Sequence, residues 1–260
     1  MTTLHTTGIK QEIAEENTIL RALVGSSVHG LGIAGTDDRD EMGVVLEPPE
    51  YVIGLRHFEQ YIQRDQPNGV RSQPGDLDLV LYSLRKWCSL ALKGNPSVLL
   101  LLFVPEEQCV VVTREGRSLR QLAWAFASKR AGAAFMGYMV QQKQRLLGER
   151  GQKNVKRPEL EEAYGFDTKY ASHILRLGYQ GIEYMNTGQL SLPMSAPEQK
   201  FIRDVRTGKV EFQDVMTHAG ILEKELQDAI DGSPLPDQPD YEAVNNFLIS
   251  TYSSWWWKAG

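Results

Sequence analysis

The chain of 260 residues has an apolar fraction of 42%, which is enough to bury a core, and its formal net charge of −5 argues against a protein that binds long nucleic acid over its whole surface. The longest apolar run, at 98–104, is too short to span a bilayer, and the N-terminus lacks the pattern of a signal peptide. We therefore expect a cytoplasmic protein with no membrane partner.

The first half of the chain predicts alternating strands and helices. A short polar helix is expected at 8–17, and two further helices at 84–94 and 95–103. The predicted strands are 18–25, 41–48, 77–84 and 109–113. This alternation indicates an α/β fold.

The pattern becomes helical after residue 114. Amphipathic segments are expected at 114–126, 131–148, 167–188, 196–208, 210–230 and 241–257, with a Pro/Asp-rich linker at 231–240. We therefore predict a core domain at 1–114 and a helical domain at 115–260. Three adjacent tryptophans, Trp255–Trp257, cannot all lie on one side of a helix. One or two of them would pack on the body and leave the others to a partner or a stacked base.

The segment "VGSSVHGLGIAGTDDRDEMGVV", residues 24–45, carries the clearest chemical signal. A buried strand ends in Gly25, and the turn that follows exposes backbone N–H groups. Gly25 allows a phosphate to come close to the backbone, and Ser26 or Ser27 adds a hydroxyl donor. These features predict an anion-binding turn.

Two carboxylates follow this turn. Asp38 and Asp40 are two residues apart and would lie on the same face of a strand, where they repel each other unless a cation lies between them. Mg²⁺ is the natural cation, because it prefers oxygen ligands and substrate phosphates. Asp78 at the start of the next predicted strand, or Asp76 two residues before it, would supply a third carboxylate for a two-metal site. The alternative is an ordinary Gly/Asp-rich surface turn.

The order of strand, Gly-Ser turn, Asp-x-Asp and third acidic strand resembles the nucleotidyltransferase superfamily of DNA polymerase β. More narrowly, the chain resembles the predicted nucleotidyltransferases related to the RNA-repair-associated polymerase-β-like proteins. The resemblance covers most of the chain and includes "GSSVHGLGIAGTDDRDEMGV", "GDLDLVLYSLRKW", "LALKGNPSVLLLLFVP" and "DTKYASHILRLGYQGIE". Many relatives have a basic residue directly after Gly-Ser and an aromatic residue two further on, whereas this chain has Ser27 and His29.

The resemblance implies a mixed-sheet nucleotidyltransferase core followed by a C-terminal helical domain. It implies that Gly25 and Ser26 hold a triphosphate, that Asp38 and Asp40 bind metal, and that Asp78 is the third carboxylate. The expected cofactor is a pair of Mg²⁺ ions, with Mn²⁺ as an alternative. The expected partner is an NTP, with ATP as the first candidate.

A basic stripe is expected on the helix at 167–188. Lys169, His173 and Arg176 are spaced i, i+4, i+7 and share one face, opposite Ile174 and Leu177. Residues 129–176 contain ten Lys or Arg against five Asp or Glu, in an otherwise acidic chain. The stripe could be a solvated helix face, but the resemblance favours a basic surface that binds the triphosphate or the acceptor.

These observations predict an enzyme that transfers a nucleotidyl group from an NTP to a hydroxyl and releases pyrophosphate. The acceptor could be an RNA or DNA end, a protein or a small molecule. The alternatives are a nucleotide-binding regulator with little turnover and an antitoxin-like partner on the same fold. The sequence names neither the base of the nucleotide nor the oligomeric state.

Overall fold

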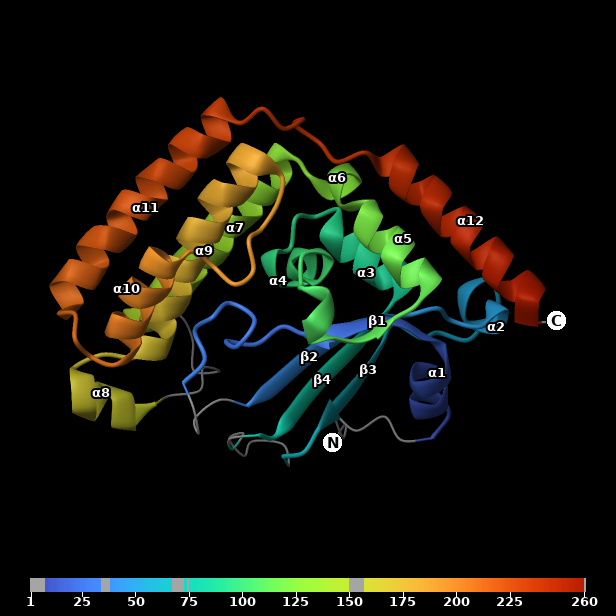
Figure 1. Ribbon diagram of the computed structural model, residues 1–260, viewed down its shortest axis with the longest axis horizontal. Helices are drawn as coiled ribbons and strands as arrows, with labels where there is room; N and C mark the ends of the chain where they lie inside the picture. The colour runs from blue at the N-terminus through green and yellow to red at the C-terminus, as the bar shows by residue number, and fades with distance from the viewer. Residues whose placement is uncertain (1–7, 34–37, 67–72, 74, 150–156, 260) are drawn as a thin grey trace. The chain divides into compact units, whose positions relative to one another are not determined.

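The computed structural model describes residues 8–33, 38–66, 73, 75–149 and 157–259 (Figure 1). The chain forms two compact units. Unit 1 comprises 1–92, 97–126 and 240–260, and unit 2 comprises 93–96 and 127–239. Within the described residues, none of the helices has both the length and the apolar character that crossing a bilayer requires.

Unit 1 is built on a mixed five-stranded sheet in the order β3-β4-β2-β1-β5. Its strands are β1 (Thr18–Leu23), β2 (Arg39–Val45), β3 (Gln60–Arg64), β4 (Leu77–Ser83) and β5 (Cys109–Val112). The central pair, β2 and β4, is parallel, and the other three pairs are antiparallel. The prediction of a mixed-sheet α/β core is confirmed.

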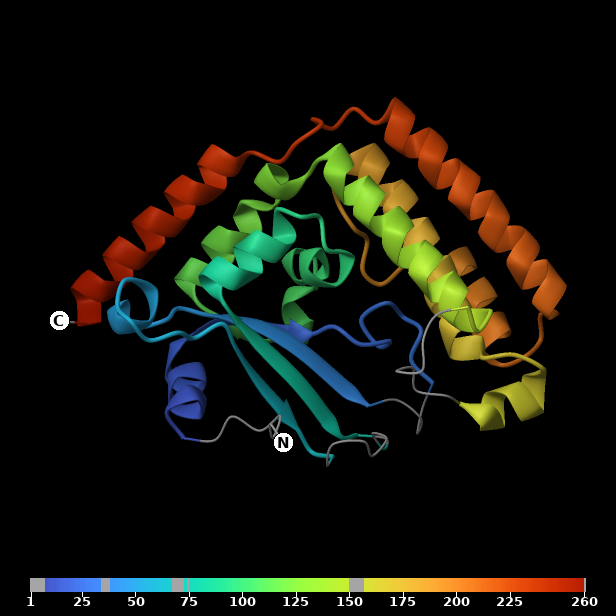
Figure 2. The same cartoon turned by 180° about the vertical axis from the view of Figure 1, so that it is seen from behind.

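Helices cover both faces of this sheet (Figures 1 and 2). The helices outside the bundle of unit 2 are α1 (Ile9–Asn17), α2 (Pro49–Val52), α3 (Leu84–Ala91), α4 (Pro96–Leu99), α5 (Arg114–Gln121), α6 (Ala123–Phe126) and α12 (Tyr241–Ala259), with 3₁₀ turns at Leu100–Leu102 and Glu106–Gln108. On one face, Ile13 of α1 packs in a cluster with Leu79 and Leu81 of β4. On the other face, α5 approaches β1 so closely that a Cβ on Gly116 would lie 2.2 Å from the carbonyl oxygen of Ile19.

Unit 2 is a helical bundle of α7 (Lys129–Leu146), α8 (Pro158–Tyr164), α9 (Thr168–Thr187), α10 (Ala196–Arg206) and α11 (Phe212–Gly232). Helix α9 packs against α7, α10 and α11. Two glycines of α9 allow this close packing, since a Cβ on Gly178 would meet Leu222 at 2.9 Å and one on Gly181 would meet Phe135 at 3.1 Å. The helices of unit 2 therefore pack around α9 as one bundle.

The observed elements differ from the sequence analysis in two respects. The strand β3 and the short helices α2 and α8 were not predicted. The β3 segment "QYIQR" is a short edge strand with one polar residue before its apolar pair and two after it, which is not an alternating strand pattern. The predicted boundary at 114/115 assigns α5, α6 and α12 to the helical domain, whereas their contacts group them with the sheet. Helix α5 packs on β1, and α12 packs on α3 and α6.

A buried carboxyl group attaches α12 to the sheet unit. The Tyr252 hydroxyl donates to Oε2 of Glu47 at 2.5 Å, and the Trp256 indole N–H donates to the Glu47 carbonyl oxygen at 3.1 Å. Burial raises the pKa of the Glu47 carboxyl group above its ordinary value. Of the three tryptophans, Trp256 therefore packs on the body, while Trp257 is 87% exposed.

Candidate active site

The candidate site is a row of residues that crosses neighbouring strands of unit 1. In the parallel pair β2–β4, Asp40 lies directly opposite Asp78. Residues in matched register point to the same face of a sheet, and neighbouring strands are about 4.8 Å apart. This face is the one opposite α1, because Leu79, which alternates with Asp78, packs on α1. Two carboxylates are thus held side by side, and both are partly exposed.

Gly25 extends this row on the other side of Asp40. The Val24 N–H donates to the Asp40 carbonyl oxygen at 3.0 Å, which brings the end of β1 beside β2. A Cβ placed on Gly25 would lie 2.7 Å from Oδ2 of Asp40 and 3.1 Å from its Cβ. The absence of a side chain at position 25 is therefore what gives the Asp40 carboxylate its space.

The Gly-Ser turn is a compact, anchored structure. The N–H groups of Val28 and Leu31 donate to the carbonyl oxygens of Gly25 and Ser26, at 3.3 and 3.0 Å. Val28 and Leu31 are buried, whereas Ser26 is partly buried and Ser27 is exposed. In the part of the chain that the structure describes, no acceptor is found for the N–H groups of Ser26 and Ser27. Both therefore remain available to an anion.

A cation completes the row at its other end. Arg64 of β3 lies opposite Asp78, and its Nε donates to Oδ1 of Asp78 at 3.1 Å. The side chains of Arg64 and Asp78 are 44% and 25% exposed, so this ion pair is open to solvent. The order across the sheet is thus cation, carboxylate, carboxylate and glycine. The ion pair offsets part of the repulsion between Asp78 and Asp40.

The neighbouring acidic residues have other partners. Asp76, the alternative to Asp78, accepts hydrogen bonds from the Gln66 side chain and the Gln73 N–H. Glu41 is fully buried on the opposite face, where Arg21 and Arg39 donate to its carboxylate. Neither carboxylate belongs to the row.

Asp38 lies directly before β2 and is partly buried. Because it precedes the strand, strand alternation does not determine the direction of its side chain, and its role as a metal ligand stays a prediction. The adjacent carboxylate, Asp37, lies outside the described residues.

The residues of the row suit a magnesium ion. Among the described residues, no three His, Cys, Asp or Glu side chains gather into a metal site by themselves. Mg²⁺ does not need such a cluster, because it is usually bound by one or two carboxylates together with water and substrate phosphates. Asp40 and Asp78 are two hard oxygen donors in register, and Gly25 leaves space beside one of them. This donor set fits Mg²⁺.

The predicted basic stripe lies in unit 2, on α9. Lys169 is exposed, and His173 and Arg176 are partly buried, while Ile174 and Leu177 on the other face are buried as predicted. The Nη1 of Arg176 donates to Gln180 Oε1 at 3.4 Å. The approach of this stripe to the Gly-Ser turn, which belongs to unit 1, stays a prediction.

The surroundings of His173 are strongly positive. Burial lowers the pKa of His173 well below its ordinary value, and the charges of Arg176, Arg145, Lys169 and Arg157 lower it further. The imidazole is therefore neutral at pH 7 and can act only as a neutral donor or acceptor. Four cations therefore act on the neutral imidazole, and one of them, Arg157, is paired with Asp167. A net positive field of this kind favours an anionic ligand.

Two of these cations and Arg64 were not identified from the sequence. Arg145 comes from α7, and Arg157 lies directly before α8, where it donates to Asp167 at 3.0 Å and stacks over the ring of Tyr170. Only the three-dimensional arrangement brings them to the stripe. Arg64 ends the short segment "QYIQR", whose pattern gives no strong strand signal, and a hairpin pairing of this segment with "LDLVLYS" was not considered.

Comparisons with known proteins place the chain in a family. No curated protein matches the chain. Among solved structures, the chain is similar to a nucleotidyltransferase-like protein from Exiguobacterium sibiricum 255-15, at 11% identity and a TM-score of 0.29, over 86% of this chain and 75% of that one. The family model described as "RNA repair pathway DNA polymerase beta family" matches residues 4–250. The chain therefore belongs to the RNA repair pathway DNA polymerase beta family.

Proposed function

We propose that the protein is a Mg²⁺-dependent nucleotidyltransferase that transfers a nucleotidyl group from an NTP, with ATP as the first candidate, to a hydroxyl acceptor. The observation that carries this proposal is the row of Gly25, Asp40 and Asp78, followed along the chain from Gly25 by the partly buried Ser26 and the exposed Ser27. Family membership supports the polymerase-β-like chemistry, while the substrate, the metal and the acceptor are inferred from the residues.

Each part of the row has a distinct task in this reaction. The N–H groups of Ser26 and Ser27 would donate to phosphate oxygens, as backbone amides at a glycine turn commonly do. Asp40 and Asp78, with Asp38 as the further predicted ligand, would hold Mg²⁺. When bound, Mg²⁺ neutralises charge on the transferring phosphate and on pyrophosphate. Asp78 would also lie near the acceptor hydroxyl and help to remove its proton.

Lys169, His173 and Arg176 would bind the phosphate oxygens that the turn amides and Mg²⁺ do not contact. Arg176 is the most effective of the three, because its planar guanidinium group can bind a phosphate through two parallel hydrogen bonds. The positive surroundings of His173 favour an anion at this place.

The direct test is incubation of the protein with each α-labelled NTP, Mg²⁺ or Mn²⁺, and an oligonucleotide, protein or small-molecule acceptor. We expect release of one pyrophosphate for each labelled acceptor formed. Binding of the NTP without pyrophosphate release would contradict the proposal and favour a nucleotide-binding regulator. Co-purification with an unrelated protein whose activity it masks would favour the antitoxin-like alternative.

A further inference from the structure

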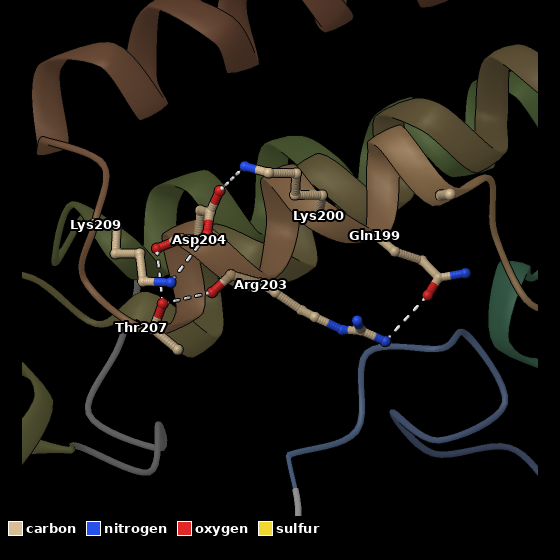
Figure 3. A pocket seen from close by; sticks show the side chains of 7 residues that line it. Gln199, Lys200, Arg203, Asp204, Thr207 and Lys209 are labelled. Carbon is tan, nitrogen blue, oxygen red and sulfur yellow. Dashed lines mark hydrogen bonds and ion pairs between the residues drawn. The ribbon is translucent and has the colours of Figure 1, made fainter.

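A second positively charged site lies in unit 2 on α10. A surface hollow of about 350 Å³ is formed by α10 and the turn that follows it (Figure 3). It is lined by Ala196, Gln199, Lys200, Arg203, Asp204, Thr207 and Lys209. Three of these seven residues are cations and one is an anion. The hollow is therefore positive in a chain whose overall charge is negative.

The two lysines are held in place by the single carboxylate. Lys200 and Lys209 reach Asp204 from two sides, at 2.7 and 3.4 Å (Figure 3). The ammonium groups are largely exposed, with side chains 80% and 69% accessible. One carboxylate neutralises only one of the two lysines. The arrangement orients both lysines and leaves a net positive charge at the mouth of the hollow.

The guanidinium group of Arg203 is oriented separately. Its Nη2 donates to Gln199 Oε1 at 3.1 Å, and Gln199 Nε2 donates in turn to the Met194 carbonyl oxygen at 2.6 Å. The extended side chain of Arg203 runs away from Asp204 toward Gln199 (Figure 3). A guanidinium fixed in this way loses less conformational entropy when it binds a phosphate.

The lining also indicates the kind of ligand. It contains no aromatic side chain, and its one apolar residue is Ala196, so it offers nothing on which a base could stack. Such a surface can bind the phosphates of a ligand but cannot hold a nucleobase. A lone nucleotide would gain little there. A polymer gains from several exposed cations at once, because its phosphates are linked.

We propose that this hollow binds the phosphodiester backbone of a single-stranded nucleic acid, which is the acceptor of the reaction. The acceptor role rests on the proposed nucleotidyl transfer, whereas the binding itself does not. The binding is independent of base sequence, since all contacts are made to phosphates.

The test measures the binding of a fluorescein-labelled 16-nucleotide oligouridylate to the full chain by anisotropy, between 50 and 200 mM KCl. The variant Lys200→Gln/Arg203→Gln/Lys209→Gln removes three charges and keeps side-chain length. Each lost phosphate contact lowers the salt slope by about 0.7 for a single strand, so we expect a slope smaller by roughly 2 and affinity at least about tenfold weaker at 50 mM. The matched control Lys93→Gln/Arg130→Gln/Lys224→Gln removes three exposed cations elsewhere in unit 2.

The proposal predicts that the control retains the affinity and salt slope of the wild type. It is overturned if the hollow variant binds the oligonucleotide as the wild type does, or if the control loses as much. It is also overturned if the hollow variant instead loses affinity for the free NTP, since the hollow would then hold the triphosphate. The binding assay needs no turnover, so it can also be run with the Asp40→Asn protein. An inactive wild-type protein that still binds the oligonucleotide through the hollow would contradict the proposed chemistry and leave this site intact.

Discussion

The contact between Gly25 and Asp40 makes the substitution Gly25→Ala a selective test of the site. The new Cβ would lie 2.7 Å from Oδ2 of Asp40, whereas an ordinary contact begins at 3.4 Å. The carboxylate must therefore move by about 0.7 Å. Gly25 does not have the positive φ that alanine disfavours, so backbone strain adds nothing to this effect. The substitution acts on the position of one carboxylate oxygen of Asp40, the proposed metal ligand.

The size of the effect follows from this displacement. A shift of about 1 Å in a catalytic group can cost about 100-fold in rate, so we expect kcat to fall roughly 10- to 100-fold, or about 1.4–2.7 kcal/mol. The assay is initial-rate pyrophosphate release at saturating NTP and Mg²⁺, with the melting temperature measured in parallel. Gly137→Ala is the matched control, because a Cβ at that position would meet no atom within 4 Å. A Gly25→Ala protein as active as the control would refute the reasoning.

Three further predictions follow from other contacts. Arg64→Gln should lower the free energy of unfolding in urea by no more than about 1 kcal/mol, because the Arg64–Asp78 pair is exposed. It should nevertheless change the Mg²⁺ concentration that gives the half-maximal rate. An unchanged Mg²⁺ dependence would show that Arg64 does not act on the metal site. Arg176→Ala should weaken NTP binding by about 1.5–3 kcal/mol with an unchanged melting temperature, and a destabilised protein of unchanged NTP affinity would make the stripe structural. The pKa of Glu47 is raised in the folded protein, so above pH 4.5 the native state holds more protons than the unfolded state. The wild type should therefore lose stability relative to Glu47→Gln as the pH rises through the raised pKa. If the free energies of unfolding of the two proteins, measured in urea from pH 4.5 to 8, run parallel, the prediction is contradicted.

The residues that local patterns determine were predictable from the sequence. Gly25, Ser26 and Asp40 lie within one segment whose strand–turn–strand order limits their separation, and the β1–β2 pairing places Gly25 beside Asp40. The α9 helix was equally clear. It begins after the N-cap Asp167, ends at Gly188, and buries Ile174 on its apolar face.

Features that depend on distant pairing were not predictable in the same way. The alignment of Asp40 with Asp78 requires the β2–β4 register, which joins segments 38 residues apart. Arg64 enters the row only because β3 forms a hairpin with β4, and the short polar pattern of β3 gave no strong strand signal. The attachment of α12 to the sheet unit depends on Glu47 and Tyr252, which are 205 residues apart. No local periodicity reports such a contact.

The central claim is that Asp40 beside the Gly-Ser turn supports metal-dependent nucleotidyl transfer. The most direct measurement compares pyrophosphate release from the preferred NTP by the wild type and by Asp40→Asn at the same Mg²⁺ concentration. The substitution keeps the shape of the side chain and removes its charge, so the melting temperature should be retained. We predict that Mg²⁺-dependent release is abolished in Asp40→Asn. A folded Asp40→Asn protein with the full activity of the wild type would contradict the account.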